Sequence, residues 1–252
     1  MDNTGIQFER YASQIRLDEI GLSGQNKLLG SKVLVIGAGG LGSPMLQYLA
    51  AAGVGRIGII DHDTIELSNL QRQTIHPTNS VGDYKTDSVK TAVNKINPDV
   101  KIDIYTEKIT TVNAREIVPK YDIIADGSDN FLTRYLVNDT CFLERKVLVS
   151  AAVSGYDGQL STYKPHISGP CYRCFNPTYP ETDDIWTCEQ VGVLGPVAGV
   201  MGCIQATEVI KELLNIGQSM AGRLLIYDGL NMSSRIIKIN SDKACKLCSG
   251  SS

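Results

Sequence analysis

The chain has 252 residues, enough for one large α/β domain or for a domain with a modest appendage. A hydrophobic content of 42% and a charged content of 20% are typical of a globular protein. The net charge of −3 provides no basic footprint, which argues against nucleic acid as a main partner.

The sequence also shows no membrane-spanning segment or secretory signal. No apolar run approaches the roughly 20 residues that span a bilayer, so no membrane partner is expected. The first residues lack the charged and apolar regions of a secretory signal. We therefore expect a cytoplasmic protein, in which paired cysteines bind metal more often than they form disulfides. The odd count of seven cysteines also fits a disulfide framework poorly.

The first 30 residues predict a helical arm of two short pieces, with Phe8, Tyr11 and Ile15 on one face. Strands and helices then alternate. The expected strands are 33–36, 57–60, 100–105, 123–125 and 147–149, and the expected helices are 44–52, 87–96 and 132–143. This rhythm predicts a doubly wound, Rossmann-like, mostly parallel α/β sheet in a nucleotide-binding half, 31–157.

The pattern changes after Gly158. Three short strands, 160–163, 224–227 and 236–239, are expected to be antiparallel, and a long helix, 197–214, lies between them in the sequence. The stretch 176–184 contains two prolines and several polar residues, which is typical of a mobile loop. We predict one domain over 1–252, with 158–252 as an antiparallel half.

A glycine-rich turn follows the first strand. Gly37, Gly39 and Gly42 satisfy G-x-G-x-x-G, with Gly40 inside the turn. Glycines allow a tight turn and let backbone N–H groups approach phosphate, and the following helix N-terminus adds positive potential. Asp61 ends the next strand, where a carboxylate can accept hydrogen bonds from ribose hydroxyls. The turn predicts nucleotide binding but does not identify the nucleotide.

Polar and charged residues follow at the carboxyl edge of the predicted sheet. Arg72 can bind phosphate bidentately, Asn69 can donate to phosphate oxygens, and Lys85 adds a second positive charge. Ser68 and Gln73 belong to the same stretch and are also candidate nucleotide-binding residues. A triphosphate needs this neutralisation more than a nicotinamide dinucleotide does, although each residue alone is also typical of a solvated surface.

Two carboxylates close the strand at 123–125. Asp126 and Asp129 stand where a carboxylate that faces polyphosphate is a natural magnesium ligand. The simpler interpretation is that Asp129-Asn130 caps the next helix. We take Asp129 and Asn130 as candidate cofactor-binding residues.

The cysteines form a separate pattern. Cys171-x-x-Cys174 and Cys245-x-x-Cys248 predict a tetrahedral four-thiolate zinc site, which is structural because no coordination position stays open. Free thiols or disulfides are the alternatives. Cys188 stands apart from both pairs and is a candidate acyl acceptor or sulfur-handling residue, or else a small buried side chain. The remaining two, Cys141 and Cys203, are expected in the core.

Taken together, these residues resemble the MoeB/ThiF/HesA family, the bacterial relatives of ubiquitin-activating enzymes, over nearly the whole chain. The matching motifs are GAGGLG at 37–42, IDHDTIELSNLQRQ at 60–73, GDYK ending at Lys85, DGSDN at 126–130, CYRC at 171–174, TCEQVGVLGP at 187–196 and the C-terminal CKLC.

The resemblance implies a homodimeric nucleotidyltransferase that adenylates the terminal Gly-Gly carboxylate of a ubiquitin-like sulfur carrier protein and releases pyrophosphate. Molybdopterin and thiamine biosynthesis are the implied pathways, and ATP, Mg²⁺ and Zn²⁺ are the implied cofactors. It further implies that Asp129 is the magnesium-linked residue essential for adenylation, that Arg72 and Lys85 act in catalysis, and that a loop near Cys188 passes over the carrier tail. The residues implied to bind ATP are Gly40, Asp61, Asn69, Arg72 and Lys85.

The chain departs from this family at Ser13, where an arginine usually reaches the partner subunit's ATP site. Arg16, one helical turn away, or Arg10 could replace it. The sequence shows no rhodanese-like extension, so we expect a separate persulfide sulfur donor. Two other functions remain open: a carrier-binding scaffold without catalysis, and an NAD-dependent dehydrogenase, which would leave Arg72, Lys85 and both cysteine pairs unexplained.

Overall fold

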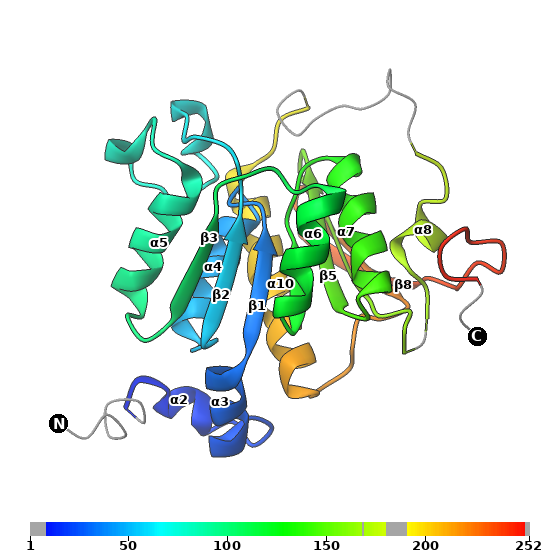
Figure 1. Ribbon diagram of the computed structural model, residues 1–252, viewed down its shortest axis with the longest axis horizontal. Helices are drawn as coiled ribbons and strands as arrows, with labels where there is room; N and C mark the ends of the chain where they lie inside the picture. The colour runs from blue at the N-terminus through cyan, green and yellow to red at the C-terminus, as the bar shows by residue number, and fades with distance from the viewer. Residues whose placement is uncertain (1–8, 168, 180–190, 250–252) are drawn as a thin grey trace.

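One continuous eight-stranded sheet organises the chain, with the strand order β3-β2-β1-β4-β5-β6-β7-β8 (Figure 1). The computed structural model describes residues 9–167, 169–179 and 191–249. The parallel strands are β1 (Lys32–Ile36), β2 (Arg56–Ile60), β3 (Lys101–Tyr105), β4 (Ile123–Asp126) and β5 (Val147–Ser154). The strand order reverses beside β1, so β1 and β4 form the switch point at which open α/β sheets bind ligands.

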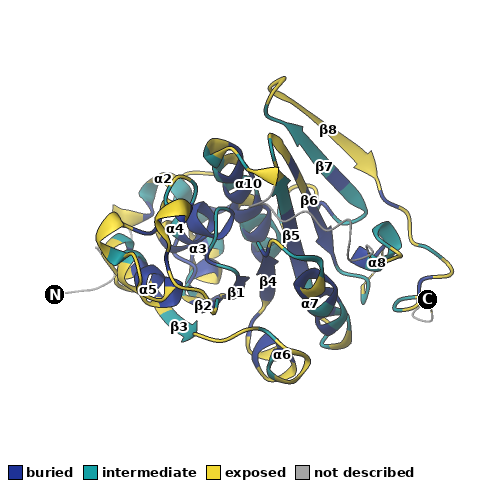
Figure 2. Cartoon of the chain, turned by 90° about the horizontal axis from the view of Figure 1, so that it is seen from above, coloured by how far each residue is buried: buried dark blue, intermediate teal, exposed yellow. Residues whose placement is uncertain are grey.

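Helices cover both faces of the parallel region (Figure 2). The helices α4 (Gly42–Ala51) and α5 (Lys85–Ile96) contribute to one apolar core together with α10 (Gly195–Leu214). On the other face, α6 (Thr111–Ile117) and α7 (Phe131–Leu143) enclose a second core with β4. The central strands are buried on both sides, which explains their nearly continuous Val/Ile/Leu sequences.

The antiparallel region is built on the same sheet. β5 turns at Gly155 into β6 (Asp157–Tyr163), followed in space by β7 (Arg223–Asp228) and β8 (Ser233–Lys238). The short helix α8 (Tyr172–Phe175) lies beside α7. Because β5 pairs with a parallel strand on one side and an antiparallel strand on the other, the two predicted halves share one sheet.

The predicted parallel sheet with a C-terminal antiparallel extension is confirmed. The sequence missed α6, a seven-residue helix that begins at the Thr110 cap, and it predicted β5 five residues too short. The arm contains α2 (Ala12–Ile15) and α3 (Gly21–Gly30), with Tyr11 buried, whereas Phe8 lies outside the described residues. Single-turn helices are η1 (Leu67–Asn69), η2 (Thr78–Ser80) and η3 (Val118–Lys120).

Within the described ranges, every helix is too short or too polar to cross a bilayer.

Candidate nucleotide site and thiolate cluster

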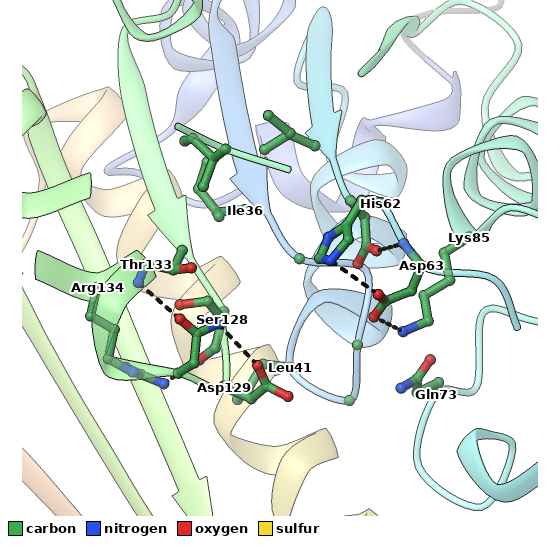
Figure 3. Close-up of a pocket in the computed structure, with 18 of the residues that line it drawn as sticks. Ile36, Leu41, His62, Asp63, Gln73, Lys85, Ser128, Asp129, Thr133 and Arg134 are labelled. Atoms are coloured by element: carbon green, nitrogen blue, oxygen red, sulfur yellow. Dashed lines mark hydrogen bonds and ion pairs between the residues drawn. The ribbon is translucent and has the colours of Figure 1, made fainter. Parts of the chain in front are cut away.

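A cavity of about 440 Å³ opens at the carboxyl ends of the parallel strands (Figure 3). It collects side chains and backbone from the turns that follow β1, β2, β3 and β4. Of the predicted nucleotide-binding residues, those that line it are Gly37, Gly39, Gly40, Asp61, Arg72, Gln73, Lys85, Asp129 and Asn130. Gly42, Ser68 and Asn69 are not among the lining residues. The fold therefore brings most of the predicted site together.

The glycine loop is shaped by close backbone contacts. Gly37 has φ of +90°, a conformation that favours glycine. A Cβ on Gly42 would lie 2.1 Å from the Gly37 carbonyl oxygen, so this glycine serves the packing of α4 against β1. In the part of the chain that the structure describes, a Cβ on Gly39 would have one neighbour within 4 Å, the Gln73 amide nitrogen at 3.9 Å. Gly39 thus leaves the open backbone that a phosphate could approach.

The Asp61 carboxylate accepts two backbone hydrogen bonds, one of them from the glycine loop. Its Oδ2 accepts a hydrogen bond of 2.8 Å from the Ala38 N–H, and its Oδ1 accepts one of 2.8 Å from the Asp63 N–H. Each carboxylate oxygen keeps a second acceptor position, so the predicted ribose contact stays chemically open. The sequence did not indicate that Asp61 also orders the loop.

A buried histidine, which the sequence analysis missed, contacts the carbonyl of the same residue, Ala38. His76 Nε2 lies 3.0 Å from the Ala38 carbonyl oxygen, and Nδ1 lies 2.9 Å from Ser88 Oγ. Because a carbonyl can only accept, Nε2 carries the proton and Nδ1 accepts from the serine hydroxyl. Burial lowers the pKa of His76, against the opposing effect of the Ala38 carbonyl. The neutral imidazole is therefore the form that fits.

The cationic residues of the cavity already have contacts. Lys85 Nζ lies 2.8 Å from Asp63 Oδ2, with the lysine buried and the aspartate half exposed (Figure 3). The Arg72 side chain donates to the Ser68 carbonyl at 3.1 Å. An incoming phosphate would compete with Asp63 for Lys85, so this pair is an exchangeable contact that the sequence did not predict.

Ser68 and Asn69 shape the turn η1. Ser68 Oγ donates to the Glu66 carboxylate at 3.2 Å, and the buried Asn69 accepts from the Glu66 N–H at 3.3 Å. This turn presents Arg72 and Gln73 to the cavity. Direct contact of Ser68 and Asn69 with a nucleotide stays a prediction.

The two aspartates after β4 occupy different environments. Asp126 is fully buried, with hydrogen bonds from Ser128 N–H at 2.9 Å and Ser150 Oγ at 3.3 Å. Asp129 is exposed at the cavity and accepts a long bond of 3.4 Å from Asn130, which itself caps α7 by accepting from Thr133 N–H. Asp126 therefore holds the strand end, and Asp129 is the carboxylate open to a cation.

The cavity contains further residues that the sequence analysis did not select. Glu107, Lys108 and Ile109 come from the segment that follows β3, and Arg134 comes from the first turn of α7. The sequence could have indicated these residues, because the first three follow a predicted strand and Arg134 follows the Asn130 cap. A second cavity of about 560 Å³ adjoins the first and shares Asp129, Arg134 and Val153 with it.

The four predicted zinc ligands converge. The sulfur atoms of Cys171, Cys174, Cys245 and Cys248 all lie within 4.8 Å of one another, and three of the S···S distances are 3.4, 3.6 and 3.9 Å. A tetrahedral site with Zn–S bonds of about 2.3 Å requires S···S distances of about 3.8 Å. All four are free thiols rather than disulfides. The geometry fits a four-thiolate metal site.

The remaining predictions differ in outcome. Cys141 is buried as expected, but the placement of Cys203 in the core is wrong, because it is partly exposed in a groove beside Tyr48 on α4. Cys188 lies outside the described residues, as do residues 180–184 of the predicted mobile loop. The described start of that loop is anchored, since the Tyr135 hydroxyl donates to the Asn176 and Thr178 carbonyls at 2.9 Å.

The arm residues lie at the end of the sheet away from the cavity (Figure 1). Ser13 and Arg16 are exposed, and the Arg10 side chain donates to the Ile96 carbonyl at 2.9 Å. Within one chain these arginines are therefore on the wrong side to contact a nucleotide in the cavity.

This fold and site have known counterparts. The ThiF family model matches residues 11–248, and the chain belongs to the ThiF family. It is 48% identical to adenylyltransferase and sulfurtransferase MOCS3 of Arabidopsis thaliana over 247 residues, which is 98% of this chain and 53% of that protein. It is 44% identical to SAMP-activating enzyme E1 of Haloferax volcanii over 242 residues, 96% of this chain and 89% of that protein. The predicted family is confirmed, and the predicted enzyme class agrees with these names.

Among solved structures, E. coli MccB with ATP superposes with a TM-score of 0.82 at 22% identity, over 96% of this chain and 74% of MccB. This likeness establishes the fold. The chain spans about half the length of the MOCS3 relatives, so their complete activity does not transfer with the match.

Proposed function

We propose that this chain is an adenylyltransferase that activates the C-terminal Gly-Gly carboxylate of a ubiquitin-like sulfur carrier protein with ATP. The observation that carries the proposal is the single cavity in which the glycine loop, Arg72, Lys85 and Asp129 face one another, in a member of the ThiF family. The relatives named MOCS3 and SAMP-activating enzyme E1 support carrier activation as the reaction.

In the proposed reaction, a carboxylate oxygen of the carrier attacks the α-phosphorus of ATP. A new O–P bond forms, the bond from the α-phosphorus to the bridging oxygen breaks, and pyrophosphate leaves with the electron pair. No protein nucleophile is required, so the chain contributes positioning and charge stabilisation. Arg72 and Lys85 would neutralise phosphate charge, and Asp61 would accept from the ribose while it holds the Ala38 N–H.

A magnesium ion would neutralise charge on the phosphates when bound. The exposed carboxylate of Asp129 fits this role, because carboxylate oxygens are preferred magnesium ligands and its hydrogen bond from Asn130 is long, at 3.4 Å. Zinc would be held by the four thiolates and would have a structural role, since four protein ligands leave no open position. Unpaired thiols suit the reducing cytoplasm expected from the sequence.

The second cavity supplies an approach for the carrier. It meets the first at Asp129, Arg134 and Val153, so an extended tail lying in it would bring its terminus toward the phosphates. A Gly-Gly terminus could lie close to the backbone there because it carries no side chains. The proposal includes sulfur transfer to the acyl adenylate, either from a separate persulfide donor or through Cys188. The pathway would be molybdopterin or thiamine biosynthesis.

A homodimer is also part of the proposal. The arm is remote from its own cavity, so Arg16 or Arg10 could complete only the site of a second copy. Mixed Arg16→Ala and Arg72→Ala subunits would then form a heterodimer with one intact site. Recovery of activity on mixing, after subunit exchange is confirmed, would support this arrangement, and an Arg16→Ala chain as active as wild type would exclude Arg16 from it.

The deciding experiment is ATP–pyrophosphate exchange by the purified chain against a panel of Gly-Gly-ended ubiquitin-like carriers. Carrier-dependent exchange that falls in Arg72→Ala supports adenylation. ATP binding without exchange by any carrier would favour a scaffold, for which the departure at Ser13 is the specific reason. NADH binding in place of ATP would favour a dehydrogenase.

A further inference from the structure

Arg134 is an arginine that the proposed reaction has not yet used. It lies on α7, one turn after the Asn130 cap, and only 8% of its surface is exposed. It borders both the nucleotide cavity and the adjoining cavity. Figure 3 shows its guanidinium beneath the turn that carries Ser128 and Asp129. Its charge therefore stands where the two cavities meet.

Among the described residues, Arg134 has no ion-pair partner within 4 Å, and its hydrogen bonds go to neutral carbonyls. Nη1 donates to Ala151 O at 2.8 Å, and Nη2 donates to Ser128 O. The buried carboxylate of Asp126 is bonded to Ser128 and Ser150 instead. A guanidinium has five N–H donors, so three are not used in these two bonds.

The Ser128 side chain, next to Arg134, is a further polar group of this region. Ser128 is 8% exposed, lines the nucleotide cavity, and its Oγ has no hydrogen-bond partner among the described residues. Buried polar groups are normally hydrogen-bonded, and a buried charge without a counterion is costly. These two groups line the nucleotide cavity, one cationic and one a hydroxyl, and they match an anionic ligand that arrives with the substrate.

We propose that Arg134, with the Ser128 hydroxyl beside it, binds the terminal carboxylate of the acyl substrate at the junction of the two cavities. This inference rests on the proposed function and assigns it a carboxylate-recognition residue. The physical need is clear, because a carboxylate and a triphosphate repel each other. A fixed guanidinium between the cavities would offset that repulsion, and its planar donors match a carboxylate.

The carbonyl bonds explain why this residue is an arginine. They lock the guanidinium to β5 and to the Ser128 turn, so the donors that remain are held in place before a ligand arrives. A lysine would keep the charge but could not hold two carbonyls and a carboxylate with the same planar geometry.

The experiment compares two forms of one ligand. A fluorescent peptide ending in Gly-Gly, with either a free C-terminal carboxylate or a C-terminal amide, is titrated into the full chain, and binding is followed by anisotropy. Wild type should prefer the acid by about 30-fold or more, which is the cost typical of removing one partner from a buried charge pair. Arg134→Gln should bind both forms equally, and Arg134→Lys should keep part of the preference.

A matched control is Arg173→Gln, which removes a partly exposed arginine that pairs with Asp139 and lines neither cavity. It should leave the ratio of acid to amide affinity unchanged. Circular dichroism melting checks that each variant folds, and the acid–amide comparison on wild type needs no variant at all.

Equal binding of acid and amide by wild type would overturn the proposal, and so would an Arg134→Gln chain that keeps the wild-type preference. Neither readout needs catalysis. If the acid preference depends on Arg134 but no carrier supports pyrophosphate exchange, carboxylate recognition stands and the proposed adenylation fails. If exchange occurs and the preference does not depend on Arg134, only the assignment of Arg134 fails.

Discussion

Arg173, which lies inside the first cysteine pair, forms a bidentate salt bridge with Asp139 on α7, with Nε donating to Oδ1 at 2.7 Å and Nη2 donating to Oδ2 at 2.6 Å. Its guanidinium also lies over the Tyr135 ring, 4.7 Å from the centroid. The neighbouring Tyr172 N–H donates to Asn138 Oδ1 at 2.8 Å. The thiolate cluster is therefore fastened to the helix whose other end is capped by Asn130 at the nucleotide cavity.

The first prediction concerns this cluster. Purified protein should contain about one zinc per chain, and Cys174→Ser should lower the melting temperature by roughly 5 °C or more, because binding of a structural metal contributes directly to folding. Metal analysis and thermal melting measure both quantities. Cys203→Ser is the matched control, since Cys203 is outside the cluster. Zinc-free protein of the same stability would contradict a structural site.

The second prediction separates the two aspartates after β4. Asp129→Ala should abolish pyrophosphate exchange and leave the melting temperature nearly unchanged, because its side chain is exposed at the cavity. Asp126→Ala should destabilise the fold by about 2 kcal/mol or more, since it leaves a buried N–H and a hydroxyl without their acceptor. Near-normal exchange by Asp129→Ala would mean that Asp129 is only part of a helix cap.

The contrast between Asp126 and Asp129 also shows which features of the site could not be predicted from the sequence. Strand ends follow from buried Val/Ile runs, so the sheet and its carboxyl edge could be predicted. Which of two nearby aspartates turns inward depends on Ser150, which is 24 residues from Asp126 in the sequence. The Lys85–Asp63 pair and the His76–Ala38 contact were missed for the same reason, because both depend on tertiary placement.

The cysteine cluster was easy to predict from the sequence, and the helix α6 was hard to predict. Two Cys-x-x-Cys pairs have a restricted set of chemical uses, so their convergence across 74 residues could be predicted from spacing alone. The helix α6 has only seven residues, most of them polar, and it depends on the Thr110–Asn113 capping box rather than on an apolar stripe. Short elements of this kind give little periodic signal.

The third prediction distinguishes two glycines of one loop. Gly42→Ala should cost about 2 kcal/mol or more, because its Cβ would overlap the Gly37 carbonyl oxygen. Gly39→Ala should fold normally and weaken ATP binding, since its Cβ would point into the space where a phosphate is expected. Urea unfolding and nucleotide titration test the pair. ATP affinity unchanged in Gly39→Ala would place the phosphates elsewhere.

The fourth prediction is a pH dependence that originates at His76. Burial lowers the pKa of this histidine in the folded chain below its ordinary value of 6.5. Below about pH 6.5 the unfolded chain therefore binds more protons at this position, so stability falls as the pH decreases toward the folded pKa, and the loss is absent at higher pH. The protonated ring would also lose the ability to accept from Ser88 Oγ.

His76→Gln should be less stable than wild type near neutral pH and should lose less stability between about pH 7.5 and 5.5. The measurement is the free energy of unfolding in urea at each pH. His166, whose pKa is also lowered by burial, contributes to both chains alike, so it cancels in the difference between wild type and His76→Gln. Because His76 holds the Ala38 carbonyl, ATP affinity should weaken over the same pH range in wild type more than in the variant. Parallel stability curves for the two chains would show that His76 titrates with an ordinary pKa and does not hold the glycine loop as a neutral ring.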